Sequence, residues 1–171
     1  MTKETNYDLA QQNEFLANPP RWSGYSEVTE TLTIGGTDPA VVGNWESPST
    51  QVISENSALD HLFDYTTNPG SITYIGTDDI IVRCVFNASV RFSANNAVSR
   101  FQWGKNGAPS ATRFMTRKIG TGADVGSIGA TRSFELSTGD YLDLFFGADT
   151  LGDLLIDHAE YSVTAVAKAY S

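Results

Sequence analysis

The strongest constraint on the fold is an alternation of apolar and polar residues through one long segment, DIIVRCVFNASVRFS, at residues 79–93. Side chains that alternate with a period of two lie on opposite faces of a β-strand. One face of this segment carries Val82, Cys84, Phe86, Ala88, Val90 and Phe92. The other face carries Ile81, Arg83, Val85, Asn87, Ser89 and Arg91. Because this second face begins with apolar residues, we predict a long core strand whose outer face is not ordinary solvent surface.

Shorter segments with the same period continue along the chain. They are EVTETLTI at 27–34, GSITYIGT at 70–77, SIGATRSFEL at 127–136 and DYLDLFFG at 140–147. The segment 97–120 predicts two further strands around Asn106-Gly107, a dipeptide that accepts positive φ in a tight hairpin. Six to nine strands at spacings of about ten residues, with turn residues between them, are typical of a sandwich or jelly roll. We therefore predict an all-β fold with two antiparallel sheets.

The beginning of the chain has a different composition from the rest. The first 24 residues are mostly polar and include Pro19-Pro20, which favours extended backbone before it and ends any helix. The remaining chain is long enough to bury one core, since the 171 residues are 40% hydrophobic. We predict an N-terminal arm at 1–24, extended or forming a short helix, and one domain at 25–171.

The arm carries more large apolar side chains than a solubilising tail needs. Such a segment cannot fold alone and is suited to ordering against a partner. We predict that it attaches the protein to its partner through Tyr7, Leu9, Phe15, Leu16 and Trp22.

Charge and cysteine content narrow the class of protein. Eleven Lys and Arg against twenty Asp and Glu give a net charge of −9, which disfavours nucleic acids and anionic membranes as partners. No basic and apolar leader follows Met1, and no apolar run is long enough to span a bilayer, so we expect synthesis in the cytosol. Cys84 is the only cysteine, and its position on a strand predicts a small core residue.

Acidic residues gather near the C-terminus without a metal-binding pattern. Asp149, Asp153 and Asp157 recur every four residues, but Gly147 and Gly152 favour a loop with a short strand. The spacing differs from that of a calcium loop, and neither His61 nor His158 has the partners of a zinc site. We predict solvated acids, no metal and no cofactor; a bound cation is the alternative.

No arrangement of residues predicts catalysis. Ser127 in VGSIG lacks the glycine two residues before it that a nucleophile elbow requires. A serine-histidine-acid triad would need a histidine beside this serine. None of the acidic residues stands alone in an apolar segment, which is the setting typical of a catalytic carboxyl group with a raised pKa. Asp140 precedes a strand and is predicted to bind neighbouring backbone amides. We predict that the protein is not an enzyme.

The segment DYLDLFF has bulky residues on both faces. Leu142, Leu144 and Phe146 alternate with Tyr141, Asp143 and Phe145, so one face fills the core and the other requires a cover. A second copy of the chain is the simplest cover. We predict that Tyr141 and Phe145 become buried only when the protein trimerises.

The order of ASVRFS, KNG and STGDYLDLFF…AEYSVTAV along residues 27–169 resembles the tumour necrosis factor-like jelly roll, the fold of the complement q globular head. It is more similar to the versions of this domain in tailed-phage virion proteins. The resemblance implies a ten-strand, two-sheet roll that trimerises through one sheet, with the DYLDLFF strand and the final strand in that sheet. The trimer interface is then predicted to contain Tyr141, Asp143, Phe145 and Val85.

The resemblance and the arm together predict a non-enzymatic virion structural protein of a tailed phage. It would be a homotrimer that decorates or cements a capsid, or a spike, with the arm bound to the major capsid protein or another virion protein. It would be assembled in the cytoplasm of the host bacterium and located in the virion. The alternative is a binding protein: the receptor- or glycan-binding tip of a phage fibre, using Trp22, Trp45 or Trp103, or a secreted-type ligand of the same fold.

Overall fold

The structure, a computed structural model, describes residues 19–26, 30–36, 54–55, 62–65, 71–109, 113–121 and 124–169. All regular secondary structure in this part of the chain is β-strand. The strands form two sheets, and every strand pair is antiparallel. The predicted all-β, two-sheet antiparallel jelly roll is therefore confirmed.

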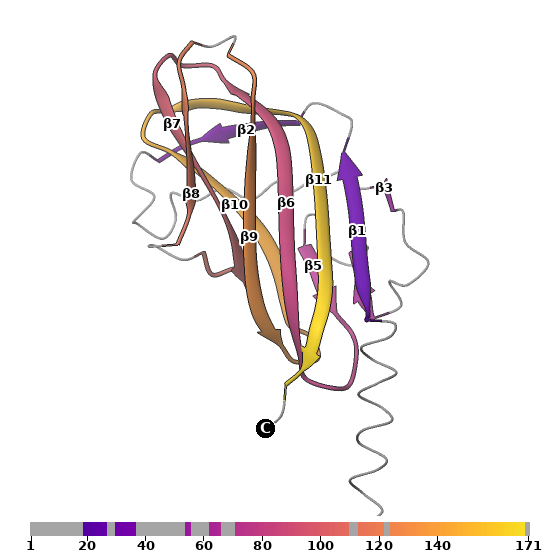
Figure 1. Cartoon of the computed structure of the whole chain (residues 1–171). Helices are drawn as coiled ribbons and strands as arrows, with labels where there is room; N and C mark the ends of the chain where they lie inside the picture. The colour runs from indigo at the N-terminus through magenta and orange to yellow at the C-terminus, as the bar shows by residue number, and fades with distance from the viewer. Residues whose placement is uncertain are drawn as a thin grey trace, which may run out of the picture.

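Sheet A is built on the two longest strands, β6 and β11, which pair along most of their length (Figure 1). The sheet has the order β3-β1-β11-β6-β9, and β2 pairs with the beginning of β11. Its strands are β1 (Arg21–Ser26), β2 (Glu30–Ile34), β3 (Ser54–Glu55), β6 (Ile80–Phe92), β9 (Gly126–Leu136) and β11 (Gly152–Lys168).

Sheet B packs against one face of sheet A and has the order β4-β5-β10-β7-β8. Its strands are β4 (Phe63–Asp64), β5 (Ser71–Tyr74), β7 (Ala97–Lys105), β8 (Met115–Ile119) and β10 (Tyr141–Ala148). The resemblance placed the DYLDLFF strand and the final strand in one sheet. This is wrong, because β10 pairs with β5 and β7 whereas β11 pairs with strands of sheet A.

Aromatic rings from both sheets meet in the core. Phe86 of β6 lies 5.9 Å from Phe146 of β10 and 5.2 Å from Tyr161 of β11, measured between ring centroids. Phe101 lies edge-on to Phe146 at 5.0 Å, and Trp103 lies edge-on to Tyr161 at 6.4 Å. Offset and edge-to-face pairs of this kind add to the stabilisation that burial provides. This aromatic cluster joins the two sheets.

The strand at 79–93 has the predicted orientation. All of its predicted core residues are buried, from Val82 to Phe92, and Cys84 among them is fully covered. Burial raises the pKa of the Cys84 thiol, so that thiol is a protonated core group. The positive φ predicted for a tight turn at Asn106-Gly107 is confirmed, at 55° and 71°, and Lys105 and Ala108 form a bridge across the turn. The turn does not join the two paired strands directly, because the ladder between β7 and β8 ends at Phe101 and Met115.

The predicted domain boundary is wrong by a few residues. The first strand begins at Arg21, so the boundary after Gly24 falls inside β1. Trp22 was predicted to belong to the attachment arm, but its exposed fraction is 0%. It pairs with Val163, and its ring lies 6.1 Å from that of Tyr65. The strand was missed because its alternation is short and directly follows two prolines. The other predicted arm residues, Tyr7, Leu9, Phe15 and Leu16, lie outside the described residues.

The aromatic cluster gives a test of the fold. We expect Phe146→Ala to lower the free energy of unfolding by about 3–5 kcal/mol, because it leaves a cavity between the sheets. As a control, Ile75→Ala changes a side chain that is 50% exposed and should cost about 0.5 kcal/mol or less. Denaturant unfolding measures both values, and equal effects would contradict this core.

Candidate functional site: the outer face of sheet A

The face of sheet A that points away from sheet B forms a broad platform across four strands. Strand register aligns its residues in rows that run from β1 through β11 and β6 to β9. The middle row contains Ser23, Ser162, Val85 and Thr131. The row on one side of it contains Tyr25, Glu160, Asn87 and Gly129. The row on the other side contains Arg21, Thr164, Arg83 and Ser133. We call these three rows the outer A face.

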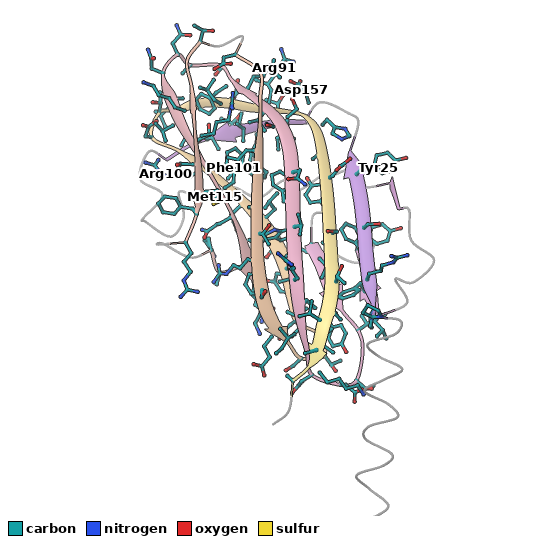
Figure 2. The ribbon with its side chains drawn as sticks, viewed as in Figure 1. Tyr25, Arg91, Arg100, Phe101, Met115 and Asp157 are labelled. Atoms are coloured by element: carbon teal, nitrogen blue, oxygen red, sulfur yellow. The ribbon has the colours of Figure 1, made fainter. Side chains whose placement is uncertain are left out.

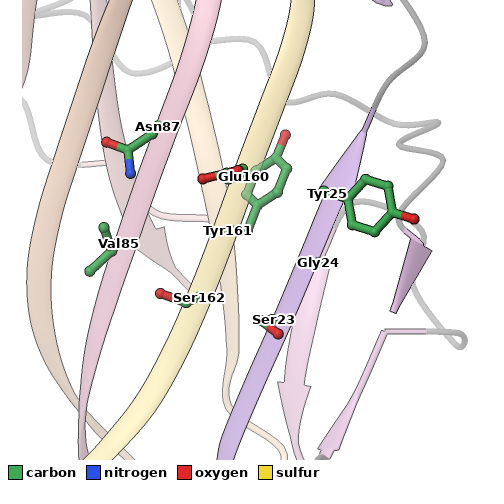
Figure 3. Close-up of a pocket in the computed structure, with 8 residues that line it drawn as sticks. All are labelled: Ser23, Gly24, Tyr25, Val85, Asn87, Glu160, Tyr161 and Ser162. Carbon is green, nitrogen blue, oxygen red and sulfur yellow. The ribbon is translucent and has the colours of Figure 1, made fainter. Parts of the chain in front are cut away.

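The middle row is flat and uncharged. Ser23, Ser162 and Thr131 have short side chains, and Val85 lies between them as the apolar centre. A hollow of about 260 Å³ opens over this row and the row of Tyr25, as Figure 3 shows. Short side chains let a second protein surface approach the strands closely.

A glycine shapes one end of the row that contains Tyr25. An added Cβ on Gly129 would lie only 2.7 Å from the Asn87 side-chain oxygen. The Asn87 side chain therefore lies over the neighbouring strand, in space that a larger residue at 129 would occupy. As a result, no side chain of β9 projects from the face at this point beside β6.

Charged residues lie at the margins of the platform. The His158 ring is 3.7 Å from the Glu160 carboxylate, and both side chains are largely exposed. At the far end of β6, Arg91 donates from Nε and Nη2 to the Asp157 carboxylate at 3.0 and 2.9 Å. Figure 2 shows this ion pair at one end of the long strands. The uncharged middle row is therefore the part of the face with the lowest cost of removal from water.

The predicted interface residues do not lie together. Val85 is on the outer A face, whereas Tyr141, Asp143 and Phe145 are on β10 of sheet B. Phe145 is only 8% exposed and Asp143 only 5% in the single chain. The prediction that Phe145 is covered only in a trimer is therefore wrong.

Neighbouring residues of the same sheet explain this burial. A Cβ on Gly104 would lie 2.5 Å from the Phe145 ring, so the ring packs directly over that glycine. The sequence pattern identified the bulk on this face but not the glycine that accommodates it.

Asp143 of β10 is held by the neighbouring strand β5 and by the turn that follows β7. Ser71 donates its hydroxyl to one carboxylate oxygen, and the Gly107 amide donates to the other at 3.1 Å. Burial raises the pKa of Asp143 above its ordinary value, and these two hydrogen bonds only partly oppose that effect.

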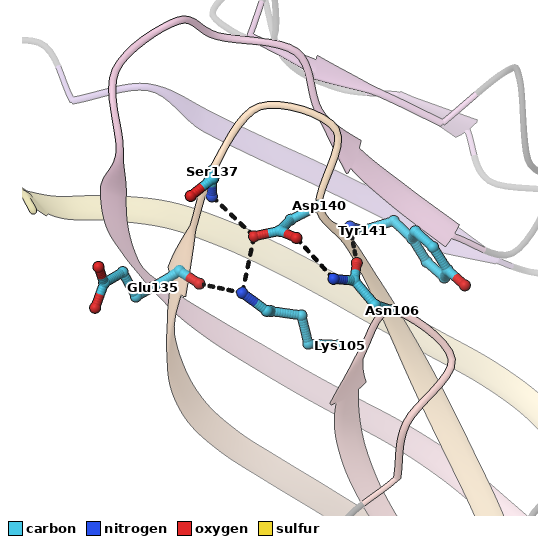
Figure 4. A network of polar contacts seen from close by, with 6 residues as sticks. All are labelled: Lys105, Asn106, Glu135, Ser137, Asp140 and Tyr141. Carbon is cyan, nitrogen blue, oxygen red and sulfur yellow. Dashed lines mark hydrogen bonds and ion pairs between the residues drawn. The ribbon is translucent and has the colours of Figure 1, made fainter.

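Asp140 is the centre of a polar network between two turns (Figure 4). Its carboxylate accepts hydrogen bonds from Lys105 Nζ at 2.8 Å, Asn106 Nδ2 at 2.7 Å and the Ser137 amide at 2.8 Å. Burial acts to raise its pKa, but the hydrogen bonds from Asn106, Lys105 and Ser137 and the charge of Lys105 lower it overall. The prediction that Asp140 binds backbone amides in its turn is confirmed.

The three acids near the C-terminus serve separate contacts. Asp149 accepts from the Val98 amide at 2.7 Å, Asp153 accepts from the Thr33 hydroxyl at 2.9 Å, and Asp157 pairs with Arg91. The predicted loop with a short strand is wrong, because β11 begins at Gly152 and is continuous to Lys168. Among the described residues no group of three His, Cys, Asp or Glu side chains is placed to hold a metal ion.

The structure does not assemble a catalytic triad from the described residues. Ser127 pairs with Ser89, and Ser89 pairs with His158, so one strand separates Ser127 from that histidine. His158 and Glu160 are on an open surface, with side chains 46% and 65% exposed. His61 lies outside the described residues. No helix with the length and hydropathy needed to cross a bilayer occurs in the part of the chain that the structure describes.

Comparison with known proteins identifies the fold. No family model matches the chain, and no curated protein matches its sequence. Among solved structures, the globular domain of zebrafish complement 1qA protein matches at 14% identity and a TM-score of 0.52, over 88% of this chain and 99% of that one. Eiger TNF from S. frugiperda matches at 8% identity and a TM-score of 0.55, over 90% and 96%.

This chain has the jelly-roll fold of the C1q and TNF domains. Murine APRIL at pH 8.0 matches as well, at 7% identity and a TM-score of 0.50, over 85% of this chain and 99% of that one. At these identities the likeness concerns the fold alone.

Most residues of the outer A face were not predicted as interface residues from the sequence. A signal for them exists in AEYSVTAV, where Ser162 and Thr164 alternate with the core residues Tyr161 and Val163. Small polar residues on a central strand indicate a flat outer face, but aromatic residues elsewhere gave a stronger signal for an interface.

Asp140 and Asp143 should respond in opposite ways to neutralisation. We expect Asp140→Asn to lower the free energy of unfolding at pH 7 by about 2 kcal/mol, because it removes charge-assisted hydrogen bonds. Since the folded pKa of Asp140 is lowered, its contribution is present above the ordinary carboxyl pKa of about 3.9 and is lost as pH falls through the folded value.

Asp143→Asn should instead raise the free energy of unfolding by about 1 kcal/mol at pH 7, because it removes a buried charge. The folded pKa of Asp143 is raised, so this advantage declines as pH falls through that value. Thermal unfolding between pH 3 and 7 measures both variants. A loss of stability in both at neutral pH would contradict the assigned environment of Asp143.

Proposed function

We propose that this protein is a non-enzymatic structural module that assembles as a homotrimer through the outer A face, and that in this form it decorates or cements the capsid of a tailed phage. The observation that carries the trimer is the uncharged middle row through Val85, at the centre of the largest sheet. The phage setting is supported by the similarity of ASVRFS, KNG and STGDYLDLFF to tailed-phage virion domains.

The distribution of charge on the outer A face favours contact between copies. Burying an ion without a partner is costly, so a stable interface places its centre where charge is absent. Arg83 and Glu160 lie in the rows on either side of Val85, with opposite charges on one face. A symmetric assembly can therefore pair the rim of one copy with the rim of the next.

The N-terminal segment is the proposed attachment to the particle. In a trimer, three such segments are presented together, so weak individual contacts combine into strong attachment. Because Trp22 belongs to the core, the attachment segment ends before Arg21.

The glycan-binding alternative loses two of its three candidate aromatic residues. Trp22 is 0% exposed and Trp103 is 2% exposed, so neither offers a face to a sugar ring. Trp45 lies outside the described residues. This observation favours the structural role over a tryptophan-based sugar site.

A charge placed in the middle row tests the trimer. We expect the native protein to have a mass of three times 18.5 kDa in light scattering, and Val85→Glu to have the mass of one chain with an unchanged far-ultraviolet spectrum. The matched control is Val125→Glu, at a residue that is 55% exposed outside the outer A face, and it should stay trimeric. A trimeric Val85→Glu, or a native monomer, would contradict the proposed interface.

Deletion of residues 2–18 tests the particle attachment. The shortened chain should keep its trimeric mass and melting temperature, because β1 remains intact, but should no longer be incorporated into particles. Full occupancy of particles by the shortened trimer would show that attachment comes from the jelly roll.

A further inference from the structure

A second hollow opens at the edge of the molecule where β9 of sheet A lies beside β7 of sheet B. The ladder between β7 and β8 ends at the pair Phe101 and Met115, while β7 continues to Lys105. A hollow of about 340 Å³ lies beside this continuation, between β7 and β9. Figure 2 shows Arg100, Phe101 and Met115 at this edge, on the other side of the view from Tyr25. The hollow is therefore separate from the outer A face hollow.

Arginines gather here without acidic partners. Arg113 and Arg132 line the hollow, and Arg100 lies beside it on β7. Among the described residues, no carboxylate lies within ion-pair distance of any of the three. They are three of only eleven Lys and Arg in a chain of net charge −9. A positive group on an acidic protein attracts anions to this edge of the molecule.

Arg132 is fixed in the wall of this hollow. Its Nη1 donates to the Trp103 carbonyl at 2.9 Å, and its guanidinium lies over the Phe134 ring, 4.6 Å from the centroid. Burial, and then repulsion from Arg113, lower the pKa of Arg132. The group is thus held in place before any ligand arrives, which reduces the entropic cost of binding.

Arg100 does not line the hollow, but its guanidinium packs on Phe114, which does. It lies 5.6 Å from the centroid of the Phe114 ring. Its Nη1 is buried and has no hydrogen-bond partner among the described residues. A buried donor of this kind is costly unless a ligand accepts its hydrogen bond.

The remaining walls combine apolar and polar groups. Phe114 and Met115 form an apolar side, and Met115 is 54% exposed. Gln102 and Thr131 contribute an amide and a hydroxyl on the other side. A volume of this size is within the range of pockets that hold small ligands.

We propose that this arginine hollow binds the carboxylate of an acidic sugar. Guanidinium groups bind carboxylates through paired charge-assisted hydrogen bonds. Phe114 and Met115 would contact the C–H face of the sugar, and the amide and hydroxyl groups would bind ring hydroxyls. The site does not require an exposed tryptophan. It adjoins the proposed trimer interface, because Thr131 belongs both to the hollow and to the middle row of the outer A face.

Titration of the full chain with sodium glucuronate, followed by amide chemical shifts, tests the site. We expect saturable shifts at residues 113–115 and 130–132, and much weaker binding of glucose, which lacks the carboxylate. Arg113→Gln should weaken glucuronate binding about tenfold or more, because it removes a charge-assisted contact. Lys118→Gln makes the same change of charge at an exposed residue of β8 outside the hollow and should bind like the native chain.

Three results would overturn the proposal. Glucose binding as tightly as glucuronate would show that the arginines do not select the ligand, and inorganic phosphate binding as tightly would show that no sugar is recognised. Equal losses in Arg113→Gln and Lys118→Gln would show a general effect of charge. Light scattering on the same samples adds a further check, because loss of the trimer in Arg113→Gln without loss of glucuronate binding would assign the arginines to contact between copies.

Discussion

The contact between aromatic rings of the two sheets is the interaction on which the rest of the structure depends. Phe86 and Tyr161 of sheet A meet Phe101, Trp103 and Phe146 of sheet B at centroid distances between 5.9 and 6.5 Å. Once these rings face the core, the period of two places their strand neighbours on the outside. The position of Val85 and Ser162 on the outer A face therefore follows from the burial of Phe86 and Tyr161.

The outer faces of the two sheets differ in what remains uncovered. On sheet B, Phe145 packs over Gly104, and Asp143 is bound by Ser71 and Gly107, so these groups are already satisfied in one chain. On sheet A, the middle row presents short uncharged side chains around Val85. For this reason we assign assembly to sheet A. We propose that the arginine hollow, which adjoins this face at Thr131, binds a ligand.

Local features were predictable from the sequence because neighbouring residues determine them. The alternation around Cys84, the positive φ at Asn106-Gly107 and the hydrogen bond from the Ser137 amide to Asp140 all depend on short segments. The pairing of β10 and β11 into different sheets depends on partners far away in the chain, which periodicity does not identify. Trp22 was misplaced for the same reason, since its burial requires Val163 and Tyr65.

The same limit applies to the sites. Aromatic bulk in DYLDLFF indicated a covered face, but only the structure places Gly104 beneath Phe145. The arginine hollow joins residues from β7, β9 and the segment before β8, and no single segment of sequence contains its pattern.

The central claim is that the outer A face is the contact between copies. An isotope-filtered NOE experiment on an equal mixture of methyl-labelled and unlabelled chains measures it directly. The account predicts intermolecular NOEs from the Val85 methyl groups to protons of another copy. The absence of these NOEs from Val85, together with intermolecular NOEs at Tyr141 or Phe145, would contradict it.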